Sequence, residues 1–406
     1  MNRANSKIYK AVIVGGGASG LALAIKLSNK FGGENVALIE RLDRVGKKLL
    51  TTGNGQCNLT NKNCAISRFH SQNEGFFTEI INTYGEKAVI DFFNSLGVLT
   101  VCDGDKIYPY SKQASAVLDA LRYKISALKT ETYLGVSATK IINKNGEFEI
   151  ALSNNGTIRA KNVIVAVGGC AQKHLGTDGS GYSLLENLGH KLTKLYPSIV
   201  QHKCQPNLVK GLKGLKQKVK ISTKYNEKTI SFTGDLLFTD YGVSGSAVFN
   251  ISPYISGRNE PIIEVDFCPD LSYTELKKAI ENIQSNSPYL KGENVLLSIM
   301  NLKIASTVLK NCGFDLSKGV KSYSAEDIAK AVKNYSIVIT GSLGFDYAQV
   351  TKGGIDTADF DNKTLQSKLV SGVYATGEVL DVDGDCGGFN LTWAFSSAFA
   401  VADAIN

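Results

Sequence analysis

The 406-residue chain lacks the patterns that build metal sites, disulfide frameworks and membrane spans. Its four histidines fall in no metal-ligand spacing, and its eight cysteines include no Cys-x-x-Cys pair. The start, Met1–Lys10, is polar and has no apolar signal region, so the thiols are expected to be reduced. No apolar run reaches the roughly 18 residues that cross a bilayer. The sequence therefore predicts a cytoplasmic protein with no bound metal and no membrane partner.

Arginine is scarce, with only seven among the 45 basic residues. The net charge of +8 is concentrated in Lys203–Lys228, where eight lysines stand against Glu227 alone. An alternating run of lysines there places three ammonium groups on one face of a strand. Such a face suits a phosphate backbone, but lysines also prevent exposed edge strands from pairing with other chains. Both hypotheses stay open; the nucleic-acid surface would comprise Lys210, Lys213, Lys216, Lys218 and Lys220.

Glycine is plentiful, and its first cluster follows a short apolar run. That run leads into the motif at 15–20, an amphipathic helix and a second apolar run that ends in Glu40. Gly15 permits a tight strand-to-helix turn, Gly17 lets the backbone approach a pyrophosphate, and Gly20 lets the helix lie close to the sheet. Glu40 has the spacing of a carboxylate that binds a ribose. The pattern predicts a dinucleotide-binding βαβ unit.

The rest of the pattern predicts an α/β protein with an inserted domain. The nucleotide-binding domain is expected to have two segments, 1–191 and 346–406. The insertion between them is expected at 192–345, β-rich over 192–268 and helical over 269–345. The helices are expected over 79–96, 113–128, 273–284, 294–311, 324–334 and 391–404. The strands include a meander over 133–140, 148–152 and 157–160, and buried strands at 162–167 and 372–376.

Four glycine-bearing turns follow predicted strands or the segments just after them, at 15–20, 53–55, 168–169 and 377–388. Ligands bind outside the carboxyl ends of strands in a doubly wound sheet, so these turns should converge on one extended ligand. The final helix would present free N–H groups, which would stabilise the negative charge of a reduced flavin. The alternating aspartates in 381–385 resemble a calcium loop but lack its remaining ligands and its closing glutamate. A second dinucleotide motif is absent, which argues against a separate pyridine-nucleotide domain.

These motifs occur together in one known family. They are Gly15–Gly20, Gly46–Leu49, Thr52–Asn58, Leu236–Thr239, Gly242–Gly245, Val350–Gly354, Gly377–Asp381 and Gly387–Asn390. Over essentially its whole length the chain resembles the BaiN/RdsA-type NAD(P)/FAD-dependent flavoproteins, which include a bile-acid enone reductase, an aminoacetone oxidase and a ribosomal-RNA dihydrouridine synthase. Its Asn390–Ser397 segment looks most like the ribosomal-RNA branch. The resemblance implies a Rossmann-like FAD domain, a parallel sheet plus a β-meander, interrupted by an insertion with a β-rich and a helical part.

The resemblance also implies which positions hold FAD. Near the pyrophosphate and ribose these are Gly15, Gly17, Ala18, Ser19, Gly20, Glu40 and Arg41, with Val136 by the adenine. Along the flavin, the positions in the first half of the chain are Lys47, Lys48, Thr52, Gly53, Asn54, Gly55, Cys57 and Asn58. Those near the final helix are Gly377, Glu378, Gly387, Gly388, Phe389, Asn390 and Leu391. Ala166 and Gly168 are also implied. Gln56 departs from the family, in which a basic residue is commoner.

The resemblance implies an FAD oxidoreductase fed by NAD(P)H that reduces a carbonyl-conjugated C=C bond, with uridine in ribosomal RNA as the favoured substrate. The alternatives are a small-molecule flavoenzyme, either an enone reductase or an aminoacetone-type amine oxidase, and a flavin-binding sensor without turnover. Candidate proton donors are Cys57 and Cys386, although a cysteine is more often a small core residue. Polar groups of the insertion that face a substrate would be Asp240, Tyr241 and Ser244.

Overall fold

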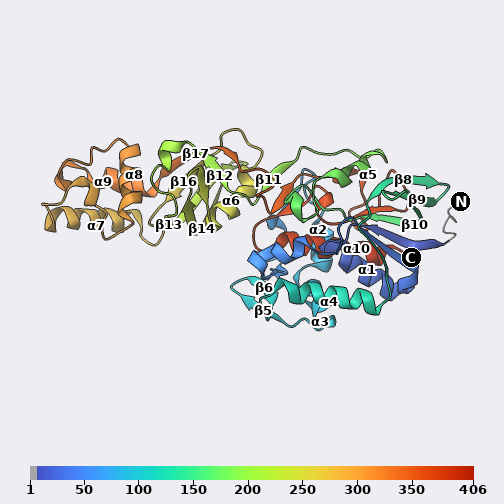
Figure 1. Cartoon of the computed structure of the whole chain (residues 1–406). Helices are drawn as coiled ribbons and strands as arrows, with labels where there is room; N and C mark the ends of the chain where they lie inside the picture. Colours follow the sequence, from blue (N-terminus) through green and yellow to red (C-terminus); the bar gives the residue numbers. More distant parts are fainter. Residues whose placement is uncertain (1–6) are drawn as a thin grey trace. The chain divides into compact units, whose positions relative to one another are not determined.

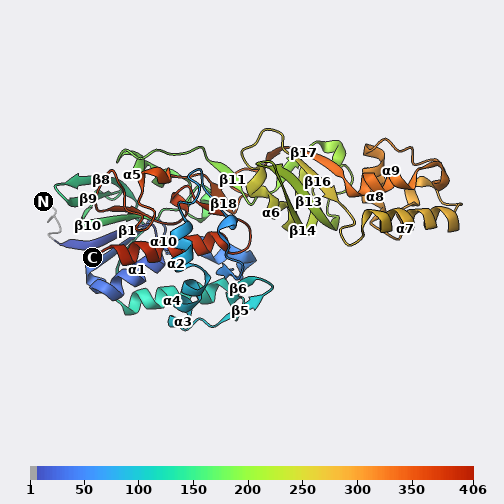
Figure 2. The same cartoon turned by 180° about the vertical axis from the view of Figure 1, so that it is seen from behind.

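The computed structural model describes residues 7–406, which form two compact units (Figures 1 and 2). The first unit contains the chain up to Tyr196 and again Val350–Asn406; the second is Pro197–Gln349. The chain passes from the first unit to the second after Tyr196 and returns after Gln349. Both points lie a few residues after the boundaries expected at 191 and 345. Residues 1–6, which belong to the polar start considered above, lie outside the described part of the chain.

The first unit is built on a seven-stranded sheet of order β7-β2-β1-β10-β9-β8, with β19 beside β10. The strands β7, β2, β1, β10 and β19 are parallel, whereas β9 and β8 are antiparallel additions. The bounds are β1 Ile8–Val14, β2 Val36–Glu40, β7 Glu131–Leu134, β8 Ala138–Lys144, β9 Glu147–Leu152, β10 Thr157–Val165 and β19 Val373–Ala375. This order is that of a doubly wound nucleotide-binding fold, and it confirms the predicted Rossmann-like α/β class.

The prediction of a meander strand at 157–160 followed by a separate buried strand at 162–167 is wrong. A single strand, β10, spans both segments. Its first half pairs antiparallel with β9, and its second half pairs parallel with β19. The predicted strand at 133–140 is likewise two strands, because β7 joins the parallel sheet and β8 starts the meander. Side-chain alternation does not reveal a change of partner along a strand.

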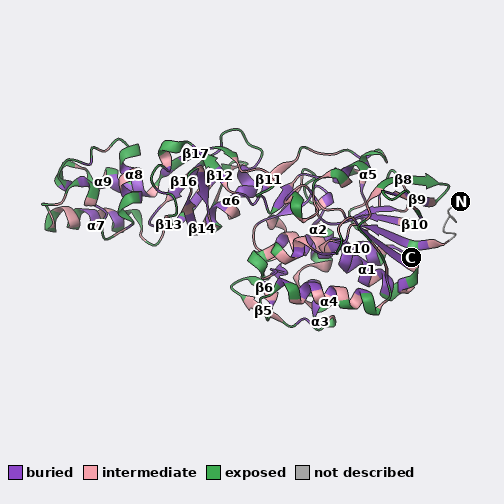
Figure 3. Cartoon of the chain, viewed as in Figure 1, coloured by how far each residue is buried: buried purple, intermediate pink, exposed green. Residues whose placement is uncertain are grey.

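The helices of the first unit bury a dense aromatic core. They are α1 Ala18–Phe31, α2 Thr78–Tyr84, α3 Glu86–Ser95, α4 Ala114–Ala127, α5 Ser183–Glu186 and α10 Phe389–Ala404. The single helix predicted over 79–96 is interrupted at Gly85, whose ψ of −145° is not helical. Ring centroids of Phe93 and Phe395 lie 5.0 Å apart, and those of Phe92 and Phe399 5.1 Å apart. Figure 3 shows α10 and the central strands as largely buried.

Short strands pair with one another among the long loops of the first unit. The strands β3 (Thr60–Asn61), β6 (Lys106–Pro109) and β5 (Thr100–Asp103) form one small sheet. In a second ladder β4 (Phe69–His70) pairs antiparallel with β20 (Asp383–Gly384). The chain re-enters this unit through β18 (Val350–Lys352). These pairings fix the positions of loops that have little regular structure of their own.

The second unit is a closed six-stranded barrel with an attached helical part. The barrel order is β12-β15-β14-β13-β16-β17, with bounds β12 His202–Cys204, β13 Lys216–Tyr225, β14 Lys228–Phe238, β15 Gly242–Ser244, β16 Ile262–Asp266 and β17 Tyr335–Ser342. The helices are α6 Ser246–Ile255, α7 Tyr273–Asn286, α8 Leu302–Asn311 and α9 Ala325–Lys333. No helix among the described residues has the length and apolar character needed to traverse a bilayer.

Three expectations for the second unit are wrong in detail. The stretch expected to be strands contains α6, whose Val248, Ile251 and Ile255 are buried in the core. The stretch expected to be helical contains β17, which pairs with β12 and β16 and closes the barrel after α9. The predicted helix at 294–311 begins only at Leu302, capped by the Asn301 side chain. Closure depends on a partner strand more than 100 residues earlier, which a local pattern cannot indicate.

Candidate cofactor-binding site

The three motif glycines of the first turn play different structural roles. A Cβ added to Gly15 would lie 2.4 Å from the Ala166 carbonyl oxygen, and one on Gly20 would lie 1.9 Å from the carbonyl oxygen of Gly15. A Cβ on Gly17 would meet nothing within 4 Å. α1 starts directly after Gly17 without a side-chain cap, so its first N–H groups have no side-chain acceptor. The turn therefore has the open, N–H-lined surface that a pyrophosphate requires.

Glu40, at the end of β2, is buried and held by the backbone. Its Oε2 accepts a hydrogen bond from Gly16 N at 2.9 Å, and its Oε1 accepts one from Leu42 N at 2.8 Å. Burial raises the pKa of this carboxyl, and the two backbone donors partly offset that effect. The Val136 amide donates to the Glu40 carbonyl at 3.2 Å. The residue predicted beside the adenine thus lies next to the residue predicted at the ribose.

Two basic residues predicted at the cofactor have protein partners. Arg41 Nη1 lies 2.8 Å from Asp178 Oδ1. Although burial opposes the change, hydrogen bonds from Ser180 and Arg41 lower the pKa of Asp178 to about 2. Lys47 Nζ donates to the carbonyl oxygen of His174 at 3.2 Å. These contacts join the loop after β2 to the loop after β10.

The loop after β2 has an irregular backbone that glycine and asparagine favour. Gly53, Asn54 and Cys57 all have φ near +57°. The Cys57 amide closes the loop by donating to the Thr52 carbonyl oxygen at 2.9 Å. The side-chain Oδ1 of the next residue, Asn58, is buried and has no hydrogen-bond partner among the described residues. The loop therefore presents an unused acceptor.

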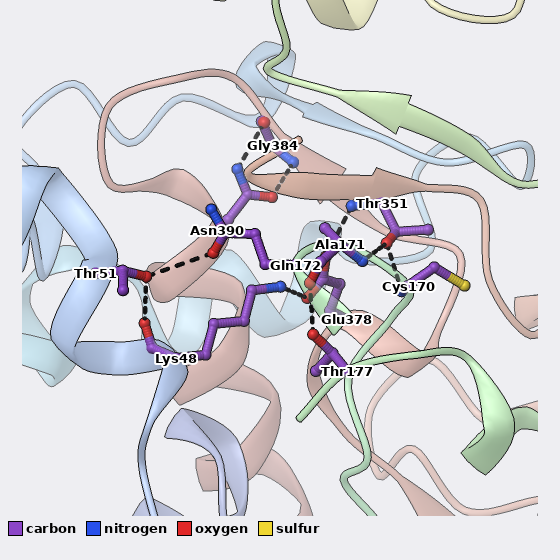
Figure 4. A network of polar contacts seen from close by, with 10 residues as sticks. All are labelled: Lys48, Thr51, Cys170, Ala171, Gln172, Thr177, Thr351, Glu378, Gly384 and Asn390. Atoms are coloured by element: carbon purple, nitrogen blue, oxygen red, sulfur yellow. Dashed lines mark hydrogen bonds and ion pairs between the residues drawn. The ribbon is translucent and has the colours of Figure 1, made fainter. Parts of the chain in front are cut away.

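A polar network joins four chain segments around Glu378 (Figure 4). Lys48 Nζ lies 3.0 Å from Glu378 Oε2, and the Thr351 amide donates to Glu378 Oε1 at 2.7 Å. The Thr351 hydroxyl oxygen accepts from the amides of Cys170 and Ala171 at 2.8 and 3.2 Å. The segments after β2, β10 and β19 and the strand β18 therefore meet at one place, although they are far apart in the sequence.

The Gly-Gly turn after β10 is required by this network. A Cβ on Gly169 would lie 2.4 Å from the Thr351 hydroxyl oxygen. Gly168 has φ +74°, and its Cβ would lie 2.8 Å from the Thr177 methyl carbon. The sequence located the turn, but it did not indicate that Thr351 would be its partner.

The C-terminal loop begins against the first helix. A Cβ on Gly377 would lie 2.7 Å from Ser19 Oγ, and Gly377 has φ +77°. Its amide donates to Ser397 Oγ at 3.0 Å, and the Trp393 indole N–H donates to its carbonyl oxygen at 3.1 Å. Two residues of α10 thus hold the start of the loop over the first turn of α1.

The same loop ends against β3. A Cβ on Gly388 would lie 2.7 Å from the Thr60 carbonyl oxygen, and Asn61 Nδ2 donates to the Gly387 carbonyl at 2.9 Å. α10 starts immediately after Gly388 without a side-chain cap, so it also offers uncapped N–H groups. The other predicted residues lie on these same segments: Ala18 in the first turn of α1, Gly55 in the loop after β2, and Phe389, Asn390 and Leu391 in the first turn of α10.

The residues fit a flavin dinucleotide. A Cβ on Gly388 would lie 3.0 Å from the unpartnered Asn58 Oδ1, so this buried acceptor faces the glycine pair that precedes α10. The N–H and carbonyl edge of an isoalloxazine ring would supply a donor for Asn58 and acceptors for the start of α10. The open space over Gly17 suits the pyrophosphate.

The two cysteines considered as proton donors differ in exposure. Cys57 is fully buried, and burial raises the pKa of its thiol to about 12. Cys386 is partly exposed, and burial also raises the pKa of its thiol. Neither thiol lies in an environment that activates it for proton transfer near neutral pH. All eight cysteines are free.

Several candidates on the second unit already have partners there. Asp240 pairs with Lys213 at 2.7 Å, and hydrogen bonding to that lysine lowers the pKa of its carboxyl. Ser244 is buried, and Tyr241 is half-buried. Lys216 and Lys218 pair with Asp235 at 3.1 Å and Asp270 at 2.9 Å, whereas Lys210 and Lys220 are exposed and form no ion pair within residues 7–406.

Comparison with known proteins assigns the chain to a family. The family model described as "HI0933-like protein Rossmann domain" matches residues 9–404. The chain belongs to this HI0933-like family. This family is one of flavoprotein oxidoreductases, as the sequence predicted. No group of three or more potential metal ligands occurs among the described residues.

The chain is similar to curated proteins over almost all of its length. It is 34% identical to the 3-dehydro-bile acid delta(4,6)-reductase of Clostridium scindens, covering 97% of this chain and 98% of that protein. It is 28% identical to the ribosomal RNA dihydrouridine synthase of Haemophilus influenzae, covering 99% of both. Among solved structures, a flavocytochrome c3 fumarate reductase aligns with 98% of this chain and 78% of its own, at 14% identity and a TM-score of 0.48.

Proposed function

We propose that this chain binds FAD, takes electrons from NADH or NADPH and reduces a C=C bond conjugated to a carbonyl group. The observation that carries the proposal is the meeting of the first turn, the loop after β2, the Gly-Gly turn after β10 and the loop before α10. Two curated relatives are named for reactions that saturate such a bond, in a bile acid and in uridine of ribosomal RNA.

The protein's own groups would bind and orient the cofactor. The N–H groups at the start of α1 would hold the pyrophosphate, and Glu40 would accept hydrogen bonds from ribose hydroxyls. Asn58 and the start of α10 would hold the flavin ring, and the dipole of α10 would stabilise negative charge there. When bound, FAD supplies hydride transfer between the nicotinamide and the substrate. The Lys48–Glu378 pair keeps the loops together on this side of the sheet.

Two acceptors are compatible with this proposal. Uridine in ribosomal RNA is favoured by the exposed, unpaired Lys210 and Lys220, which would contact phosphates while the base is unstacked. A small conjugated ketone is favoured by the higher identity to the bile-acid reductase and by the pairing of Lys213, Lys216 and Lys218 with nearby carboxylates. In either case we expect the enzyme to act in the cytoplasm.

An anaerobic half-reaction experiment tests the proposal. The FAD-loaded protein is reduced with NADPH or NADH and mixed with unmodified ribosomal RNA or with a 3-oxo-4-ene steroid. We expect one acceptor to restore the oxidised flavin spectrum and to gain two hydrogen atoms by mass spectrometry. Lys220→Ala should weaken only the RNA reaction, and Lys218→Ala is the matched control with a paired lysine.

Three outcomes would contradict the proposed reaction. A protein that never retains FAD would overturn the cofactor assignment. Reoxidation only by oxygen, with peroxide release from aminoacetone, would indicate an amine oxidase. A reduced flavin that no acceptor reoxidises would indicate a sensor.

A further inference from the structure

Three buried aspartates, Asp381, Asp383 and Asp385, alternate along the loop that precedes α10. They differ in their hydrogen-bond and ion-pair partners. Asp385 Oδ1 lies 2.8 Å from His70 Nε2, and its Oδ2 lies 3.1 Å from Arg68 Nη1. Asp381 Oδ2 accepts a hydrogen bond from the Gln72 amide at 3.1 Å. Asp383 is 1% exposed, and its Oδ2 has no hydrogen-bond partner among the described residues. A buried, unpartnered carboxyl oxygen is costly when it carries charge.

Charges of both signs surround Asp383. His70 on the adjacent β4 and Lys352 on β18 favour its ionised form, whereas Asp381 and Asp385 on its own segment oppose it. Arg68 faces the same cluster through its pair with Asp385. Burial is the largest influence and raises the pKa of Asp383 to about 7. Its protonation state is therefore sensitive to any further charge that arrives nearby.

Asp383 is connected to the start of α10 through the next residue. The next residue, Gly384, donates its amide to Asn390 Oδ1 and accepts from Asn390 Nδ2 at its carbonyl, both at 2.8 Å (Figure 4). A Cβ on Gly384 would lie 2.6 Å from the Phe389 Cβ, so the segment is closely packed against the first turn of the helix. Asp383 is therefore adjacent in the chain to a residue that is bonded to and packed against the proposed flavin-binding turn.

We propose that Asp383 takes up a proton from solvent when negative charge arrives at the bound cofactor and releases it when that charge leaves. This inference rests on the proposed function. The cofactor, when bound, would supply hydride transfer from the nicotinamide donor to the substrate, and the second hydrogen of the saturated product would come from solvent as a proton. The proton on Asp383 returns to solvent in the same step, so neither protons nor electrons accumulate. Asp383 is a positioning residue, because it acts on the cofactor through its charge.

The midpoint potential of bound FAD, measured by absorbance between pH 5.5 and 8.5, tests this inference. The wild-type holoprotein should show a change of slope near pH 7. In Asp383→Asn, which keeps the shape of the side chain, that change of slope should disappear. Asp381→Asn is the matched control, because Asp381 is buried in the same segment but has a backbone partner, and it should retain the change of slope.

The outcomes separate this inference from the proposed function. A protein without FAD refutes the proposed function itself. A holoprotein in which Asp383→Asn and wild type have the same pH dependence refutes the inference alone, as does loss of the slope change in Asp381→Asn only. If Asp383→Asn does not fold, redox-difference infrared spectra of the wild type should show a protonated carboxyl at pH 7 that increases on reduction. Absence of that signal would contradict the inference.

Discussion

The two units use charged residues in different ways. In the first unit, some ion pairs are buried or half-buried and join distant segments, as Lys48 joins Glu378 and Arg68 joins Asp385. In the second unit, most lysine–carboxylate pairs are exposed, as Lys218 with Asp270, and the exception is the largely buried pair of Lys333 and Asp266. Exposed pairs contribute little to stability, whereas removal of one partner from a buried pair is costly. Where a charge lies in the fold matters more than how many charges a segment contains.

The largest expected effect concerns the first turn of the first unit. Gly20→Val should prevent folding, because its Cβ would lie 1.9 Å from the Gly15 carbonyl oxygen. Gly17→Val should fold with an unchanged Tm in the absence of cofactor, because its Cβ meets nothing within 4 Å. Its FAD affinity should fall by about 100-fold, or about 2.7 kcal/mol, in a fluorescence titration. Unchanged FAD affinity in a folded Gly17→Val would show that the turn does not hold the cofactor.

The next prediction contrasts a buried pair with an exposed one. Arg68→Met removes the guanidinium partner of the buried Asp385, and we expect a loss of about 3 kcal/mol in urea unfolding. Lys218→Met on the barrel is the control and should leave the unfolding midpoint unchanged. An equal loss of unfolding free energy in the two variants would show that the buried pair and the exposed pair contribute alike to stability.

A third prediction concerns pH. The pKa of Asp383 is raised to about 7 in the folded state from an ordinary value of 3.8, so the folded protein binds more protons between these values. The stability that this group contributes is complete below pH 3.8 and is lost as the pH rises to about 7. Between pH 5 and pH 8, wild type should therefore lose about 2.6 kcal/mol relative to Asp383→Asn in urea unfolding. A difference that does not change with pH would contradict this.

The sequence was most informative where function and backbone geometry depend on neighbouring residues. The glycine motif with its strands, the helix near 113–128 and the final helix were predicted because turn chemistry and periodicity are local. The change of partner along β10, the helix α6 and the closing strand β17 were missed, because they depend on contacts with distant segments.

The same limit applies to the candidate site. The sequence predicted that the glycine-bearing turns at 15–20 and 377–388 are loops at one edge of the sheet. The role of Thr351 could not be predicted, because only the folded chain brings its hydroxyl to the amides of Cys170 and Ala171. Asp383 was noticed only as part of a rejected calcium pattern. The signal that distinguishes it from Asp385 is the absence of a partner for one oxygen, which a sequence does not contain.

The smallest predicted effect tests the lysines of the barrel. If RNA is bound, Lys220→Ala should reduce the slope of log affinity against log salt by about 0.7–0.9, because one phosphate contact is lost. Lys218→Ala should change the slope less, because its ammonium group is already paired with Asp270. A filter-binding assay at several salt concentrations measures both slopes. Identical slopes in both variants and wild type would identify the lysines as a solvated face.

The most direct measurement is a crystal structure of the FAD-loaded protein. We expect a pyrophosphate over Gly17 and an isoalloxazine ring between Asn58 and residues 387–391, where α10 begins. A flavin bound elsewhere, with Asn58 and the first turn of α10 free of ligand, would contradict this expectation.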